Sequence, residues 1–98
     1  MNTEMNVVKA DPAGLVEYIS TNLVKTPQEI NITPVKGGGS LVLELRVNPE
    51  DIGTVIGKGG RIAKAIRTLL SSISAKKLVN EDGSVDSFKA INLEIIDE

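Results

Sequence analysis

A lysine stands among three glycines in the segment VIGKGGRIAKAIRTLL, residues 55–70. Gly57, Gly59 and Gly60 allow positive φ angles and carry no Cβ atom that would keep a ligand away from the backbone. The segment from Arg61 onward has a helical pattern, and the first N–H groups of a helix attract anions. Three interpretations compete: a nucleotide-phosphate loop of an enzyme, a clamp on a nucleic-acid backbone, and a plain turn between two helices.

Neither common nucleotide-binding pattern matches these glycines. A Walker A loop has four residues before its Gly-Lys-Ser/Thr end. Here only three residues separate Gly53 from Gly57, and Gly59 follows Lys58 where the magnesium-binding hydroxyl would stand. The dinucleotide pattern G-x-G-x-x-G would need a glycine in place of Ile62. Because the chain also has no histidine and no cysteine, we expect no catalysis, no metal and no cofactor.

Basic side chains concentrate around the same loop. The formal net charge is −2, but the stretch between Asp51 and Glu81 contains six basic residues and no acidic one. The rest of the chain holds five basic and 13 acidic residues. Such an asymmetry focuses positive potential on one surface, as binding of a polyanion requires, although charge alone equally allows a solvated helix face. The six basic residues are Lys58, Arg61, Lys64, Arg67, Lys76 and Lys77.

The helix expected over about residues 60–78 has an apolar side and a polar side. At about 100° per residue, with Arg61 as zero, its basic residues Arg61 and Lys64 lie opposite the apolar side chains. Arg67 falls at about 240°, at the margin of the polar side, where a surface role is the simpler interpretation. Lys76 and Lys77 suit the C-terminal end of a helix. The predicted core set is Ile62, Ala63, Ile66, Leu69, Leu70 and Ile73, and the predicted exposed set is Arg61, Lys64, Thr68, Ser72 and Ala75.

The other elements follow from caps and alternation. Asp11-Pro12 and Asn48-Pro49 each join a capping side chain to a proline at the first helical position, so each predicts a helix start. Glu17, Glu50 and Asp51 are expected in helix-start or surface roles. Two segments alternate apolar and polar residues and predict strands. In order, we expect an arm over 1–10, a helix over about 12–25, an edge strand near 30–35, a turn over 36–40, a strand over 41–47, a short helix after Pro49, an acidic loop over 79–90 and a strand over 91–96.

This order predicts a two-layer α/β (α+β) sandwich. The strands 41–47 and 91–96 are joined by a helical crossover and should be parallel, whereas the KGGGS turn makes the first two strands an antiparallel hairpin. The result is a three-stranded mixed sheet with helices on one face, in one domain spanning 11–98. No apolar run suits a signal peptide or a membrane span. We therefore expect a cytoplasmic protein without membrane association.

The central segment also resembles a known signature. VIGKGGRIAKAIR is similar to the Ile-Gly-x-x-Gly signature of the KH domain, with a basic residue in the loop and aliphatic residues around it. The element order resembles the bacterial, type II variant. The segments LVEYI, LVLELRVNPEDIGTVIGKGGRIAKAIRTLL and INLEIID extend the resemblance to the small bacterial single-KH-domain proteins of the KhpA family, over about 12–78 and 91–97. The 1–10 arm and the acidic 79–90 connection depart from that pattern, and an acidic loop beside an RNA cleft would narrow specificity or weaken binding.

The resemblance implies non-catalytic binding of single-stranded RNA. The glycine loop would clamp phosphates, and one such domain holds about four nucleotides, so that affinity would depend on pairing domains. Aliphatic rather than aromatic walls fit a chain whose only aromatic residues are Tyr18 and Phe88. The expected RNA-binding residues are Ile56, Gly57, Lys58, Gly59, Gly60, Arg61 and Lys64, with Ile62 as a second aliphatic flank.

The same resemblance implies partners and a cellular role. It implies a homodimer or a complex with a larger Jag-type KH partner. It further implies a global RNA-binding protein or RNA chaperone linked to cell elongation, cell shape and cell wall biogenesis. The alternative is a protein-interaction or dimerisation module that keeps the KH fold with little RNA binding.

Overall fold

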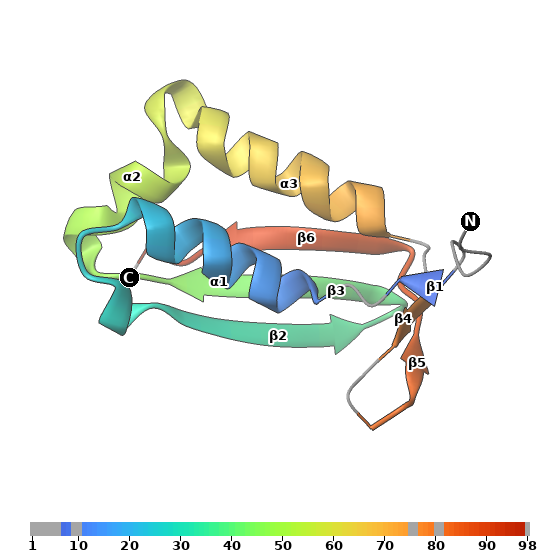
Figure 1. Ribbon diagram of the computed structural model, residues 1–98. Helices are drawn as coiled ribbons and strands as arrows, with labels where there is room; N and C mark the ends of the chain where they lie inside the picture. Colours follow the sequence, from blue (N-terminus) through green and yellow to red (C-terminus); the bar gives the residue numbers. More distant parts are fainter. Residues whose placement is uncertain (1–6, 9–10, 75–76, 80–81, 98) are drawn as a thin grey trace, which may run out of the picture.

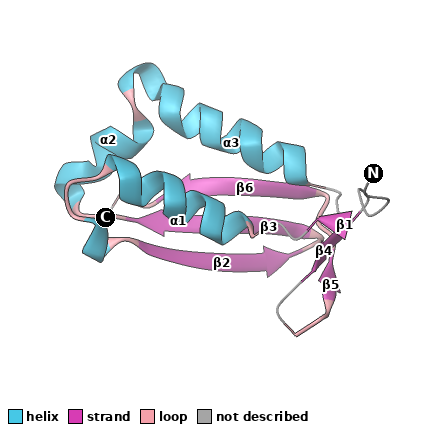
Figure 2. Cartoon of the chain, viewed as in Figure 1, coloured by secondary structure: helices cyan, strands magenta, loops and turns pink. Residues whose placement is uncertain are grey.

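The computed structural model describes residues 7–8, 11–74, 77–79 and 82–97. Its main body has two layers, a three-stranded sheet and helices that cover one face of that sheet (Figure 1, Figure 2). A second, smaller sheet projects from one end of this body (Figure 1). The helices are α1 (Pro12–Leu23), α2 (Ile52–Ile56) and α3 (Arg61–Ile73), and the short 3-10 turns are η1 (Pro27–Glu29), η2 (Pro49–Asp51) and η3 (Lys58–Gly60).

The main sheet has the strand order β2-β3-β6. β2 and β3 are antiparallel and joined by a turn in which Gly38 and Gly39 have φ angles of 59° and 80°. β3 and β6 are parallel, as a helical crossover requires. The predicted order of helices and strands and the predicted mixed sheet are therefore confirmed. The strands are β2 (Asn31–Gly37), β3 (Ser40–Arg46) and β6 (Ala90–Ile95).

The core lies between this sheet and the helices. Residues of β3 alternate between buried and half-buried, so Leu41, Leu43 and Leu45 face the helices. In register beside them, Ile91 and Leu93 of β6 are buried as well. Removal of these apolar side chains from water is the main force that holds the two layers together. The helices contribute Val16, Val55, Ile66 and Leu70 to the same core.

The second long helix differs from its prediction in two respects. α3 ends at Ile73 rather than near residue 78, because Ser74 takes an extended backbone with ψ of 150°. Lys77 consequently lies in a strand and not at a helix end, while Ala75 and Lys76 lie outside the described residues. Leu69 was predicted in the core but is 47% exposed. It is turned by about 60° from the buried Ile66, onto the flank of α3 that the sheet does not cover.

Residues 77–79 and 85–86 are strands, where the end of a helix and an acidic loop were predicted. Strand β4 (Lys77–Val79) is antiparallel to β5 (Val85–Asp86), and β1 (Val7–Val8) pairs with β4 in parallel. The sequence had also predicted no regular structure near residue 7. In the turn of the hairpin, Oδ1 of Asp82 accepts hydrogen bonds from the hydroxyl of Ser84 at 2.6 Å and from its N–H at 2.9 Å. These two hydrogen bonds lower the pKa of Asp82.

The hairpin is attached to the end of the main sheet that lies away from the glycine loop (Figure 1). Nζ of Lys36 lies 3.3 Å from Oδ2 of Asp86 and 5.9 Å from the centre of the buried Phe88 ring. The N–H of Lys89 donates to the carbonyl of Gly39 at 2.8 Å. α3 is about 20 Å long and separates the hairpin from the loop. The described acidic residues of the hairpin, Asp82 and Asp86, therefore lie away from the glycines and not beside them.

Asp51 connects the end of α1 to the short helix that leads into the glycine loop. Its side chain was expected at a helix start or on the surface, but Asp51 is only 1% exposed. The two carboxylate oxygens accept the backbone N–H groups of Lys25 and Thr26, each at 3.1 Å. These hydrogen bonds hold the chain after α1 against the N-terminal end of α2. Glu17 and Glu50, by contrast, are exposed as predicted.

Replacing Asp51 by asparagine should destabilise the protein. One of the two N–H groups would then face an amide NH2 group instead of an oxygen. A hydrogen bond to a charged group contributes about 1.5–3 kcal/mol, so we expect the free energy of unfolding in urea to fall by about 2 kcal/mol. The exposed neighbour supplies the control, since Glu50→Gln should change stability by less than about 0.5 kcal/mol. Equal stability of the two variants would contradict the role given to Asp51.

Candidate nucleic-acid interface

The glycine loop is a tight turn between two helices. α2 ends at Ile56, and the next four residues include three with left-handed backbone: φ is 81° at Gly57, 66° at Gly59 and 77° at Gly60. The N–H of Gly57 donates to the carbonyl of Gly53 at 2.9 Å, and the N–H of Gly60 donates to the carbonyl of Gly57 at 3.0 Å. Lys58 is the residue in this turn that carries a side chain. The positive φ angles expected from the sequence are confirmed.

The three glycines serve different purposes. A Cβ atom at Gly57 would lie 2.6 Å from Cγ1 of Ile62 and 2.9 Å from its backbone nitrogen, so any side chain there would collide with the start of α3. A Cβ atom at Gly59 or Gly60 would meet nothing within 4 Å. Gly57 is therefore needed for packing, whereas Gly59 and Gly60 leave an open surface that the backbone of a ligand can approach.

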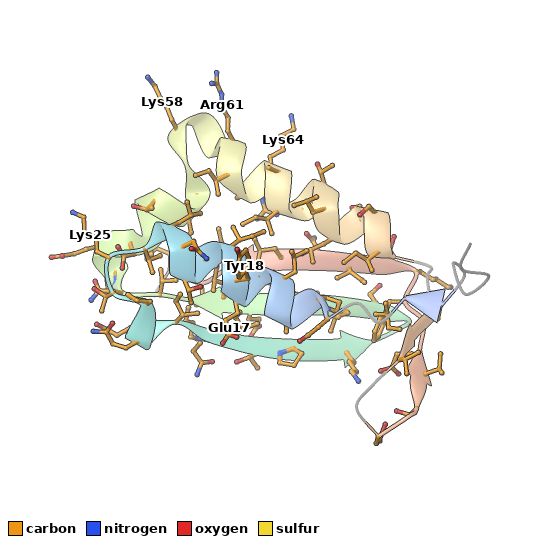
Figure 3. The ribbon with its side chains drawn as sticks, in the orientation of Figure 1. Glu17, Tyr18, Lys25, Lys58, Arg61 and Lys64 are labelled. Carbon is orange, nitrogen blue, oxygen red and sulfur yellow. The ribbon has the colours of Figure 1, made fainter. Side chains whose placement is uncertain are left out.

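Three basic side chains project around this open surface. Lys58, Arg61 and Lys64 are exposed and extend away from the sheet on the same side of the molecule (Figure 3). Arg61 and Lys64 are about 4.5 Å apart along the helix axis. Among the described residues, no carboxylate lies within ion-pair distance of any of the three. Their charges are therefore available to an anion from outside the chain.

The aliphatic residues beside the loop are less alike than the sequence suggested. Ile56 is 36% exposed at the end of α2 and can contact a ligand. Ile62 is half-buried and packs against Gly57 and the core, so it mainly supports the turn. The seven residues predicted to bind RNA lie on one continuous stretch of α2, loop and α3. Their role in binding stays a prediction.

Arg67 makes a contact that the sequence did not predict. It lies on the flank of α3 next to β6, and its Nε donates a hydrogen bond to the carbonyl of Leu93 at 3.2 Å. The helical pattern placed Arg67 at the margin of the polar side. It could not show which strand would lie beside that margin, because this depends on how the crossover packs.

The loop does not have the setting of a nucleotide-binding loop. A Walker A loop follows a strand, whereas this loop follows helix α2. In the parts of the chain that the structure describes, no group of three or more acidic side chains is placed to hold a metal ion. None of the helices in those parts is long and apolar enough to cross a membrane.

Comparison with known proteins identifies a family and several relatives of this chain. A family model described as KhpA/KhpB, KH domain, matches residues 13–86. The RNA-binding protein KhpA of Clostridium perfringens is 51% identical over 63 residues, which cover 64% of this chain and 84% of the relative. The RNA-binding protein KhpA of Treponema pallidum is 53% identical over 58 residues, which cover 59% of this chain and 72% of that protein.

A third relative extends the similarity over more of the chain. The RNA-binding protein KhpA of Chlamydia pneumoniae is 42% identical over 81 residues, which cover 83% of this chain and 91% of that protein. No solved structure matches. The mixed sheet and the order of helices are those of a type II KH domain. The chain belongs to the KhpA/KhpB family of KH-domain proteins.

Proposed function

We propose that this protein binds single-stranded RNA without catalysis, through the surface formed by the glycine loop and the start of α3. The observation that carries the proposal is the open backbone at Gly59 and Gly60, with the unpaired Lys58, Arg61 and Lys64 around it in the described structure. The relatives are named as RNA-binding proteins, which supports the proposal.

The proposed mechanism separates the RNA backbone from its bases. Consecutive phosphates lie over Gly59 and Gly60, where the backbone is open and the positive end of α3 favours anions. Lys58, Arg61 and Lys64 neutralise phosphate charge. The first bases lie beside Ile56. Because single-stranded RNA of any sequence has phosphates, this part of the surface gives affinity rather than specificity.

We base the wider role on the resemblance to KhpA proteins. On that basis the protein is a single KH domain behind an N-terminal arm and acts in the cytoplasm as a global RNA-binding protein or RNA chaperone. Its proposed partners are a second copy of itself or a larger Jag-type KH protein, and its proposed physiological link is to cell elongation and cell wall biogenesis. It is proposed to be neither an enzyme nor a membrane protein, since a chain without histidine or cysteine lacks the commonest catalytic groups.

Two carboxylates in the loop should abolish RNA binding. In the double variant Lys58→Asp and Gly59→Asp, negative charge replaces the proposed phosphate contact. The fold should persist, because Lys58 is exposed, nothing lies near a Cβ at position 59, and aspartate tolerates left-handed backbone comparatively well. The measurement is a gel shift with unstructured RNA of about eight nucleotides, alongside circular dichroism.

The control for this variant carries the same change of charge elsewhere. Ser87→Asp and Lys89→Asp lie at the hairpin end, on exposed residues away from the loop. This control should bind RNA with an affinity close to that of the native protein. Native affinity in a folded loop variant would disprove the phosphate contact and favour the interaction-module alternative.

Affinity should fall steeply as the salt concentration rises. For single strands, log K changes with log salt by about −0.7 for each phosphate neutralised. Three phosphate contacts, from Lys58, Arg61 and Lys64, give an expected slope of about −2. Removing one contact with Arg61→Ala should make the slope shallower by about 0.7. A titration by fluorescence anisotropy at several salt concentrations measures both slopes, and a salt-independent affinity would rule out the electrostatic mechanism.

Exposed apolar residues on the helix layer favour self-association as a second activity. Leu69 is 47% exposed on α3 and Tyr18 is 71% exposed on α1. If Leu69 contributes to the proposed dimer, the native protein should have about twice its chain mass of 10.4 kDa in light scattering, and Leu69→Lys should return it to a monomer. Thr68→Lys, on the neighbouring exposed position, is the matched control. A native monomer at all concentrations would contradict the homodimer.

A further inference from the structure

The short helix α2 leads directly into the glycine loop and cannot be stable by itself. It has five residues, and isolated helices shorter than about 12–15 residues are marginal in water. Ile56 is its last residue and Gly57 follows, so the first two residues of the proposed RNA surface move with α2. The position of that surface therefore depends on contacts that hold α2 from outside.

Asp51 holds the N-terminal end of α2. It precedes Ile52, the first residue of that helix, and is 1% exposed. Its two carboxylate oxygens accept the backbone N–H groups of Lys25 and Thr26, each at 3.1 Å. These donors lie 26 and 25 residues earlier in the chain. This single side chain therefore joins the segment after α1 to the start of α2.

A second and weaker link lies beside it. Oδ1 of Asn48 accepts the N–H of Glu50 at 2.9 Å, and Nδ2 of Asn48 donates to Oε2 of Glu29 at 2.8 Å. Glu29 is the last residue of η1, so this contact also joins the segment after α1 to the start of α2. The contact is exposed and water competes for its groups, whereas the hydrogen bonds of the buried Asp51 are protected from that competition. Most of the linkage is therefore assigned to Asp51.

We propose that Asp51 is a positioning residue for RNA binding, because it fixes α2 in the place from which the glycine loop starts. This inference rests on the proposed function. When the two N–H groups lose their acceptors, the start of α2 is released, and Ile56 and Gly57 lose their fixed place at its other end. The loop then has its binding geometry in only a fraction of the molecules, and the dissociation constant rises in inverse proportion to that fraction.

The sign of the effect distinguishes positioning from charge. Asp51 carries a negative charge, and Ile56 lies about 7.5 Å farther along the chain of α2. Because RNA is a polyanion, loss of that charge alone should tighten binding. Loss of a positioning contact should weaken binding. Asp51→Asn removes both the charge and one of the two acceptors, and we expect weaker binding, because salt screens the charge but does not restore the lost contact.

The test compares the RNA affinity of Asp51→Asn with that of a variant destabilised elsewhere. The dissociation constant for an unstructured RNA of about eight nucleotides should rise about five-fold or more in Asp51→Asn. Leu41→Ala is the matched control, since Leu41 is buried at the end of β3 that lies away from the glycine loop (Figure 1). Its truncation lowers stability through the core, and RNA affinity should stay native. Circular dichroism shows whether both variants are folded at the temperature of the measurement.

Two milder variants complete the comparison. Glu50→Gln removes the same charge one residue earlier, on an exposed side chain, and should bind RNA at least as tightly as the native protein. Asn48→Ala removes the exposed link and should raise the dissociation constant about two-fold. If Asp51→Asn does not fold, Asn48→Ala supplies the test, and native affinity of that variant would overturn the inference.

Amide NMR spectra without RNA give a readout that lower stability alone would not change. In Asp51→Asn, the signals of Lys25, Thr26 and residues 57–60 should move or broaden, because the link and the loop both lose their fixed geometry. In Leu41→Ala these signals should stay in place.

The outcomes separate this inference from the proposed function. If folded Asp51→Asn binds RNA with native affinity or more tightly, the loop does not depend on Asp51 and the inference is wrong, while RNA binding stands. If Leu41→Ala weakens binding as much as Asp51→Asn does, lower stability explains both results and the inference is again overturned. If the native protein does not bind RNA, the proposed function fails and the inference fails with it.

Discussion

The close packing of Gly57 against Ile62 is the constraint on which the interface depends. Because no Cβ atom fits between Gly57 and the first turn of α3, the chain can reverse within four residues and α3 can start directly above α2. That start fixes the rotation of α3 about its axis. Ile66 and Leu70 then face the sheet, while Arg61 and Lys64 face away from it. A larger residue at 57 would change all of these directions together.

The charge distribution has a spatial order that the net charge of −2 conceals. Basic residues occupy the loop and the start of α3, and the described acidic residues of the hairpin, Asp82 and Asp86, occupy the opposite end (Figure 1). The helix that separates these two ends also carries Arg67 to the edge of β6. The same amphipathic helix thus closes the core, carries basic residues that we propose to contact phosphates, and holds the Arg67 side chain beside β6.

The sequence predicted those features that depend on neighbours along the chain. Alternation fixed the strand around Leu43, the Asp11-Pro12 and Asn48-Pro49 pairs marked helix starts, and the spacing of glycines predicted the turn at Gly57. Features that depend on contacts between distant segments were missed. The burial of Asp51 requires Lys25 and Thr26 to lie beside it, and the exposure of Leu69 depends on how much of α3 the sheet covers. Strand β4 forms with partners from both ends of the chain, which local periodicity cannot show.

The central claim is that RNA lies on the glycine loop and the start of α3. Titration of isotope-labelled protein with a short unstructured RNA, followed by amide NMR spectra, tests it residue by residue. The account predicts that the amide signals of residues 57–64 shift most, and that those of residues 82–86 in the hairpin stay in place. Shifts confined to α1 and the flank of α3 around Leu69, with the loop signals unchanged, would contradict it. RNA would then bind to the exposed side of the helices rather than to the loop.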